Sequence, residues 1–320
     1  MHKKKADLFN EYFVSEANVD DAYHELPVLD YYSNHTDKTL SIVQTTEEEV
    51  INLLYKVDIT KASGHDGIGN RIIKLCSRGI AKTFTCLINT SLRIGEYPTE
   101  WKKANVTPVY KKDDHQYKKN YRPISLLPSI SKIPEKIVFT RLYEFLLEIR
   151  FLNDFQSGFR PGDSTVNQLT YIVHKIYEAL EMGKEVRMVF LDFSKAFDKV
   201  WHKGLLYKLK SLGVKDPLLS WFCSYLSDRK QRVIIEGQCS SWLSVEAGVP
   251  QVSVLGPLLF LIYINDISSN IVSDCFLYAD DTSLLEIVDN LSSFDSRLNE
   301  DLNSINQWCM EWLMELNPTK

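Results

Sequence analysis

Two apolar segments of this chain end on carboxylates, and this arrangement constrains the fold more than any other feature. Residues 185–192 (EVRMVFLD) are rich in strand-forming side chains and end on Asp192. Residues 274–286 contain two apolar runs that are separated around Asp280 and Asp281. Because β-branched and aromatic residues favour strands, we predict a buried strand over 185–192 and a hairpin over 274–286 with the acids at its tip.

These acids have the chemistry of a divalent-metal site. Two adjacent carboxylates at a buried turn are difficult to keep ionised without a cation, and hard oxygen ligands suit Mg²⁺. If Asp192 lies beside the hairpin, Asp192, Asp280 and Asp281 can hold two ions about 4 Å apart, as two-metal phosphoryl transfer requires. Each piece also has an ordinary explanation. Aspartate is common in turns, and an aspartate at a strand end can cap the next helix.

The other predicted elements favour an α+β fold, because strands and helices do not alternate strictly. Apolar periodicity predicts helices over 71–92, 133–149, 164–182, 291–312 and, in two short pieces, 203–227. Strands are expected over 104–112, from Arg122 onward, and over 232–236 and 242–247. Residues 5–60 look helical and polar, with a loop near 31–39. The apolar run 254–264 is too short to span a bilayer and is predicted to be a buried helix.

Composition and charge limit the classes of function. The chain has 320 residues, 44% of them hydrophobic, which is enough for a sizeable core in one large or two modest domains. The net charge is −5, yet residues 101–122 carry seven Lys or Arg against two Asp, a stripe that either binds phosphates or is a solvated face. Six scattered cysteines without a CxxC pair argue against zinc, and with no secretion signal they suggest an intracellular protein without a membrane partner.

Seven short motifs occur in order between about residue 45 and the end of the chain. They are SGHDGI (63–68), NYRPISL (120–126), QSGFR (156–160), FLDFSKAFD (190–198), GVPQ with SVLGP (248–257), FLYADD (276–281) and LNPTK (316–320). Together they resemble the reverse transcriptase domain of non-LTR retrotransposons, most closely that of Jockey-type elements.

The resemblance implies a right-hand polymerase with an α+β fold that contains the fingers and palm and lacks the thumb. Residues 1–45 would be an N-terminal connector, 46–184 the fingers with the upstream motif, and 185–320 a palm that is truncated before the thumb. It further implies an RNA-directed DNA polymerase that extends a DNA primer on an RNA template with dNTPs, using two Mg²⁺ ions or Mn²⁺, in the nucleus. The oligomeric state is not indicated.

The same resemblance assigns roles to the acids and to two basic residues. Asp192, Asp280 and Asp281 would hold the ions that activate the primer 3′-hydroxyl and stabilise the leaving pyrophosphate. Lys111 and Arg122 would bind the triphosphate, the arginine through paired hydrogen bonds. The alternative for these two is the solvated basic face described above.

Three further residues receive roles from the resemblance. Phe197 would lie under the incoming sugar and exclude a 2′-hydroxyl, although core packing is the commoner use of an aromatic. Gln251 would touch the nucleotide or template, or form only a local hydrogen bond. Lys320 would protonate pyrophosphate as a general acid, unless the last residue of the chain is frayed.

The chain departs from the family pattern at several positions. Val252 stands where the family has Gly, and a β-branched residue resists the backbone freedom that Gly allows there. His65 and Gly69 stand where proline is usual, and Pro134 can be accommodated only near a helix start. The alternative function is therefore an impaired fragment that keeps the fold and binds nucleic acid without copying it. A viral RNA-dependent RNA polymerase is disfavoured by Phe197, because such an enzyme must admit the 2′-hydroxyl.

Overall fold

The computed structural model of the chain describes residues 2–29, 37–250, 252–289 and 297–318. The described residues form the α-helices α1 (His2–Glu16), α2 (Glu47–Tyr55), α3 (Asn70–Leu75), α4 (Ser77–Ile94), α5 (Lys132–Glu148), α6 (Thr165–Glu181), α7 (His202–Ser211), α8 (Leu218–Leu226), α9 (Leu255–Ile264) and α10 (Arg297–Glu311). The strands are β1 (Lys103–Tyr110), β2 (Tyr121–Leu126), β3 (Glu185–Leu191), β4 (Arg229–Ile235), β5 (Gln238–Cys239), β6 (Leu243–Val245), β7 (Asp274–Tyr278) and β8 (Asp281–Val288). This mixture agrees with the predicted α+β class.

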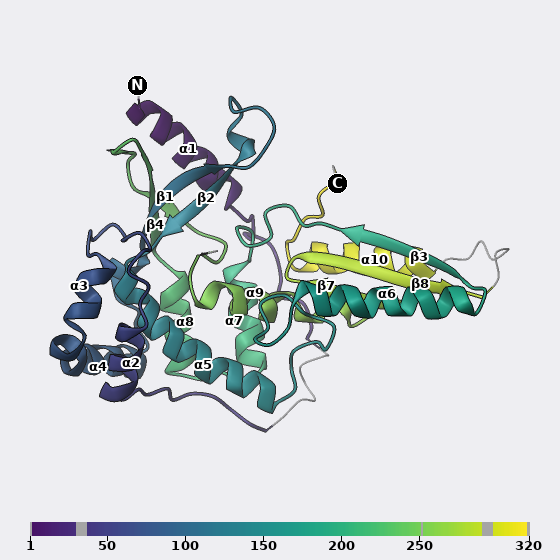
Figure 1. Cartoon of the computed structure of the whole chain (residues 1–320), viewed down its shortest axis with the longest axis horizontal. Helices are drawn as coiled ribbons and strands as arrows, with labels where there is room; N and C mark the ends of the chain where they lie inside the picture. Colours follow the sequence, from purple (N-terminus) through teal and green to yellow (C-terminus); the bar gives the residue numbers. More distant parts are fainter. Residues whose placement is uncertain (1, 30–36, 251, 290–296, 319–320) are drawn as a thin grey trace.

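The first sheet joins two distant parts of the chain. Its order is β2–β1–β4–β5, with β6 paired to β4. Strand β1 runs antiparallel to β2 and parallel to β4, so residues 103–126 and 229–245 share one sheet. Helix α1 covers one face of it, where Phe9 and Phe13 pack against Val106 (Figure 1). The start of the chain is therefore packed onto this sheet.

The second sheet is antiparallel, with the order β3–β8–β7. Neighbouring residues of a strand point to opposite faces, and β8 shows this clearly. Leu285 packs with Ile172 of α6, whereas Leu284 belongs to the main core together with Ile305 of α10. Helices α6 and α10 thus cover opposite faces of the sheet (Figure 1).

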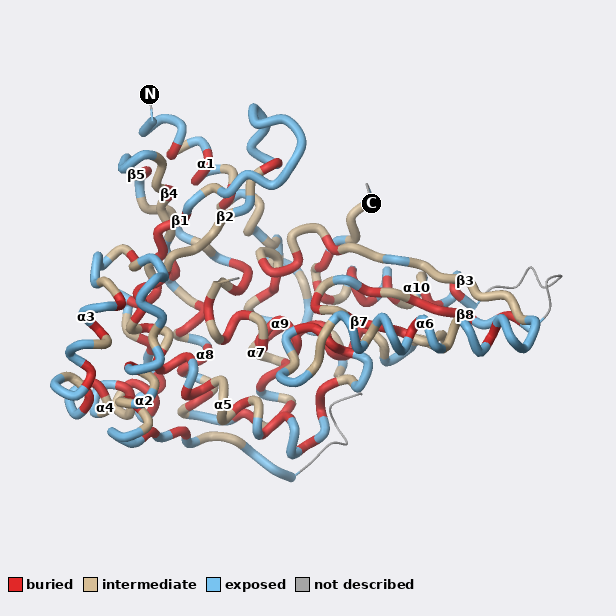
Figure 2. The backbone as a smooth tube through the Cα atoms, viewed as in Figure 1, coloured by how far each residue is buried: buried red, intermediate tan, exposed pale blue. Residues whose placement is uncertain are grey.

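The main core lies between the two sheets and is centred on α9. Every residue of this helix is buried except Pro257, and α5 and α7 pack directly against it. Figure 2 shows this buried backbone in the middle of the molecule. The prediction of a buried helix over 254–264 is confirmed, and no helix among the described residues is long and apolar enough to cross a membrane.

One buried charge ties α10 to this core. Lys208 is fully buried, and its ammonium group donates to Asp266 Oδ1 at 2.6 Å and lies 3.5 Å from the ring centre of Trp312. The indole of Trp308 donates to the same Asp266 oxygen at 3.0 Å. Because a buried ion pair needs all its partners to offset desolvation, this cluster fixes the start of the segment that leads to residues 315–317.

Several predicted elements differ from the structure. The helix predicted over 71–92 is divided at Cys76 into α3 and α4. Residues 17–29 and 37–46 contain no helix, against the prediction for 5–60, since residues such as Asp20 and Pro27 favour turns. Part of the predicted helix 291–312 and of the loop 31–39 lies outside the described residues.

The predicted burial of 185–192 is wrong in degree. Strand β3 is an edge strand, its residues are mostly half-buried, and Phe190 is 71% exposed. By contrast, the predicted hairpin over 274–286 is confirmed as β7 and β8. Pro134 lies at the third position of α5, near the helix start that its ring requires.

Candidate active site

The tip of the β7–β8 hairpin carries the acidic pair. Tyr278 pairs with Asp281, so the turn consists of Ala279 and Asp280. Ala279 has a φ of 58°, a left-handed conformation that costs a residue with a Cβ about 1–2 kcal/mol. It is also 95% buried, at 5% exposure. The turn therefore needs support from neighbouring groups to hold its shape.

Asp192 lies at the same end of the second sheet as this turn. Leu191 pairs with Thr282, and one further step in that register puts Asp192 opposite Asp281. The side-chain amide of Asn317 donates to Asp192 Oδ2 at 2.8 Å, and the Asn317 backbone N–H donates to the Asp192 carbonyl at 2.8 Å. Residues 315–317 thus run beside the segment that contains Asp192.

Asp192 and Asp280 open onto one pocket of about 400 Å³. The basic residues that line this pocket are Lys111, Lys119, Arg122, Lys195 and Lys199. Acidic and basic side chains therefore line one pocket, which can accommodate a metal ion and a phosphate chain together. Asp281 is exposed and does not line the pocket. No three His, Cys, Asp or Glu side chains in the described part of the chain form a ready metal cluster.

The basic side of this pocket comes from the connection between β1 and β2. The Lys111 N–H donates to the Asn120 carbonyl at 2.8 Å, which closes the loop just beyond the strands. Arg122 lies on β2 opposite Val109, and its side chain is exposed. The structure thus brings Lys111 and Arg122 to the pocket that contains Asp192 and Asp280.

Two lysines on the Asp192 side already have acidic partners. The Lys195 ammonium is 2.8 Å from Glu16 Oε2 and 3.2 Å from the Tyr12 hydroxyl, so α1 reaches the rim of the pocket. These partners raise the pKa of Lys195 although burial opposes them. Lys199 pairs with Glu315 at 2.5 Å. The pocket thus depends on residues from both ends of the chain.

Phe197 is both a packing residue and a pocket residue. Its ring stacks on Phe260 of α9 with centres 4.4 Å apart, and Phe159 approaches it edge-on at 5.8 Å. It is 8% exposed, and that small surface faces the pocket. The two interpretations offered by the sequence, sugar gate and core residue, are therefore compatible.

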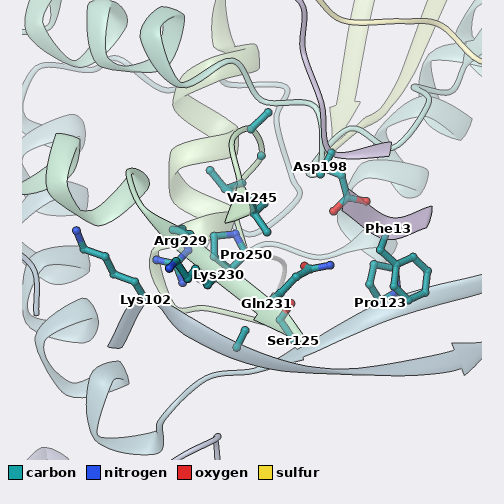
Figure 3. A pocket seen from close by; sticks show the side chains of 15 residues that line it. Phe13, Lys102, Pro123, Ser125, Asp198, Arg229, Lys230, Gln231, Val245 and Pro250 are labelled. Atoms are coloured by element: carbon teal, nitrogen blue, oxygen red, sulfur yellow. The ribbon is translucent and has the colours of Figure 1, made fainter. Parts of the chain in front are cut away.

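A second, smaller cavity of about 60 Å³ adjoins the first through Asp198, which lines both. Figure 3 shows it between Asp198, Phe13 and Pro123 on one side and the basic residues Lys102, Arg229 and Lys230 on the other. Burial raises the pKa of the Asp198 carboxyl to about 6, against the pull of Lys195.

The loop from Gly248 to α9 is fixed where it enters the helix. Gly248 has a φ of 82°, and a Cβ there would lie 2.6 Å from the Asp198 carbonyl oxygen. Glu135 of α5 accepts hydrogen bonds from the N–H groups of Val254 and Leu255 at 2.8 and 3.2 Å. Burial raises the pKa of this carboxyl. Val252 lies in the loop and is half-buried.

Two predicted site residues, Gln251 and Lys320, lie outside the described residues. Conversely, the structure gives Gln156, Asp198 and Asn317 contacts that the sequence did not assign. All three lie inside the motifs recognised in the sequence, so the motifs identified the right segments. The spacing of a motif does not show which of its residues contacts a carboxylate or a turn in another part of the chain.

Carboxylates near a hairpin tip that share a pocket with basic side chains are typical of enzymes that transfer phosphoryl groups. Comparison with known families agrees with this class. The chain belongs to the family described as reverse transcriptase (RNA-dependent DNA polymerase), which matches residues 109–320.

Individual relatives make the assignment narrower. The chain is 34% identical over 302 residues, 92% of its length, to the RNA-directed DNA polymerase from mobile element jockey of Drosophila melanogaster, and covers 33% of that protein. It is 33% identical over 301 residues to the probable RNA-directed DNA polymerase from transposon BS of the same species, again 91% of this chain and 33% of the relative. It is 32% identical over 285 residues to the probable RNA-directed DNA polymerase from transposon X-element of Drosophila melanogaster, which is 85% of this chain and 30% of the relative.

These relatives confirm the resemblance to Jockey-type non-LTR elements that the motifs indicated. The chain spans about a third of the length of the curated relatives it matches.

Proposed function

We propose that this chain provides the RNA-directed DNA polymerase of a non-LTR retrotransposon. It would extend a DNA primer on an RNA template with dNTPs. The observation that carries this proposal is the shared pocket: Asp192 and Asp280 open onto the same space as Lys111 and Arg122. Carboxylates for metal ions and cations for a triphosphate are the two sets of groups that nucleotidyl transfer needs.

The donor set at the hairpin fits a divalent cation. Asp192 and Asp280 offer carboxylate oxygens, which suit Mg²⁺, with Mn²⁺ as an alternative. Asp281 would join them, since it pairs at the turn beside them. When bound, two such ions activate the primer 3′-hydroxyl and neutralise charge on the leaving pyrophosphate. The chain's own part is to hold the carboxylates together through the β3–β8–β7 sheet and Asn317.

The nucleotide would lie between the β1–β2 connection and the hairpin. Lys111 and Arg122 would bind its triphosphate, and Phe197, rigid on Phe260, would lie under the sugar and select deoxynucleotides. A gate needs a fixed side chain, and stacking on α9 supplies that rigidity. The roles proposed for Gln251 and Lys320 rest on their motifs.

The right-hand division into fingers (46–184) and palm (185–320), after a connector (1–45), is part of the same proposal. The first sheet, however, joins strands from both sides of the 184/185 boundary, and α1 packs on that sheet. The regions would then be functional parts of one folded body. A nuclear location would follow from copying RNA at chromosomal DNA.

Primer extension on an RNA template with Mg²⁺ and dNTPs tests the proposal. Asp280→Asn and Asp192→Asn should abolish synthesis. The matched control is Asp289→Asn, which changes an exposed aspartate just beyond the far end of β8, where the ion pair with Lys184 contributes little. Synthesis that survives Asp280→Asn unchanged would contradict the metal assignment, and failure of the wild-type chain to synthesise DNA would contradict the proposed function.

A further inference from the structure

The QSGFR segment extends the edge of the second sheet next to the acidic turn. The Leu277 N–H of β7 donates to the Phe155 carbonyl at 3.0 Å, and the Ser157 N–H donates to the Leu277 carbonyl at 2.9 Å. Gln156 and Leu277 form a parallel bridge. Two segments that lie more than a hundred residues apart are therefore hydrogen-bonded just before the chain enters the turn.

The Gln156 side chain then continues past the edge and binds the turn itself. It is 2% exposed. Its Oε1 accepts from the N–H groups of Ala279 and Gly158, both at 2.9 Å, and its Nε2 donates to the Ala279 carbonyl at 3.4 Å. Both peptide groups of a buried residue in a left-handed conformation are satisfied by this one amide. We call these contacts the Gln156–Ala279 clamp.

Gly158 makes the clamp sterically possible. A Cβ at this position would lie 2.2 Å from the Ala279 backbone nitrogen and 2.8 Å from the Tyr278 carbonyl carbon, so any side chain would push the turn away. Arg160 supports the other side, because its guanidinium donates to the Asn153 carbonyl at 2.8 Å and to the Gln156 carbonyl at 3.4 Å. Three members of one motif thus serve a single contact.

We propose that Gln156 is a positioning residue for Asp280. By holding Ala279 at positive φ, it fixes the direction in which the next residue leaves the turn, and Asp280 then faces the pocket that it shares with Asp192. The inference rests on the proposed function, since it treats Asp280 as a metal ligand. Gln156 itself does not line that pocket, so its proposed role is exerted through Ala279.

Gln156 could instead act only by supporting the edge of the sheet. Gln168 distinguishes this role from the positioning of Asp280. Its Nε2 donates to the Leu277 carbonyl at 2.9 Å and to the Phe155 carbonyl at 3.3 Å. It therefore holds the same edge without touching Ala279. Gln168→Leu is the matched control for Gln156→Leu.

The first measurement is amide hydrogen exchange at Ala279 in the whole chain. Gln156→Leu should raise the exchange rate of this N–H by about tenfold or more, because a buried donor loses its acceptor, whereas Gln168→Leu should leave it unchanged. Gln156→Glu should keep the protection of this N–H only while its carboxyl is protonated, because the neutral acid supplies both an acceptor for the Ala279 N–H and a donor to the Ala279 carbonyl. This variant also covers the case in which the leucine variant fails to fold. Unchanged exchange in Gln156→Leu, or a protection factor in Gln156→Glu that does not fall as its carboxyl ionises, overturns the clamp.

The second measurement is Mn²⁺ binding by calorimetry, without nucleotide or nucleic acid. Gln156→Leu should weaken binding by about fivefold or more, and adding Ala279→Gly should restore most of it, since glycine adopts positive φ without the clamp. Equal affinities for Gln156→Leu and the wild type would overturn the positioning role. If the wild-type chain itself neither binds Mn²⁺ nor extends primers, the proposed function fails, and the exchange experiment still decides the clamp.

Discussion

Asn317 holds Asp192 at two points: its side-chain amide donates to Oδ2 and its backbone N–H donates to the carbonyl oxygen, both at 2.8 Å. The two residues lie 125 positions apart in the sequence, so the C-terminal segment is part of the site. Its side-chain hydrogen bond helps to orient a carboxylate that lines the pocket.

Asn317→Ala should lower the rate of primer extension. A hydrogen bond to a charged group contributes about 1.5–3 kcal/mol, so the expected loss in kcat is about ten- to a hundredfold with a similar KM for dNTP. Single-turnover primer extension measures it. Asn270→Ala, at an exposed loop position, is the control, and a loss confined to KM would argue that Asn317 serves nucleotide binding instead.

Val252→Gly should increase synthesis, since a β-branched residue restricts the loop that leads from Gly248 to α9. We expect a gain of about tenfold, equivalent to about 1.4 kcal/mol in the activation free energy. Val252→Ala should lie between the two. Primer extension by the three chains under equal conditions is the measurement, and a valine protein as active as the glycine variant would show that Val252 imposes no penalty.

Phe197→Leu should relax the choice of sugar. The relative efficiency of ribonucleotide over deoxynucleotide incorporation is expected to rise about tenfold, because removing an aromatic edge makes room for one hydroxyl. Competition between matched rNTP and dNTP measures this ratio. Phe260→Leu perturbs the same ring stack without touching the pocket. An equal change in both variants would mean that loss of packing, and not of a gate, is responsible.

Asp198 should make the folded chain less stable as pH rises. Burial raises its folded-state pKa from 3.8 to about 6, so between these values the unfolded chain releases a proton that the folded chain retains. The stability that the neutral carboxyl provides is thus complete below pH 3.8 and lost as pH rises through 6. Asp198→Asn should be more stable than the wild type at pH 7.5 by at most about 3 kcal/mol.

Denaturant unfolding at several pH values measures the difference in stability between Asp198→Asn and the wild type, which should vanish towards pH 4. Lys195 and Glu16 act on Asp198 in opposite senses, so Glu16→Gln serves as a control that changes the local charge and leaves the carboxyl in place. A stability difference that does not change with pH would show that folding leaves the pKa of Asp198 unshifted.

Several secondary-structure elements and the family of this protein could be predicted from the amino-acid sequence. Alternation and apolar runs located the β7–β8 hairpin, the buried helix α9 and the helix α6, because these depend on local periodicity. The motifs identified the family and predicted Asp192, Asp280 and Asp281 as the metal ligands. The same periodicity failed for β3, since an apolar strand does not show whether it lies at a sheet edge. It also failed for residues 17–29 and 37–46, where turn-forming residues decide the conformation.

The sequence by itself determined which side chains could perform the chemistry and the elements that carry them. Only the tertiary structure decided which of them meet. Asp192 and Asp280 share a pocket with Arg122, whereas Asp281 is exposed and does not line it. Gln156 contacts the turn and Asn317 contacts the Asp192 carboxylate. The reason is physical. Contacts between residues far apart in the sequence are fixed by strand register and by packing against α9, and neither can be read from local spacing.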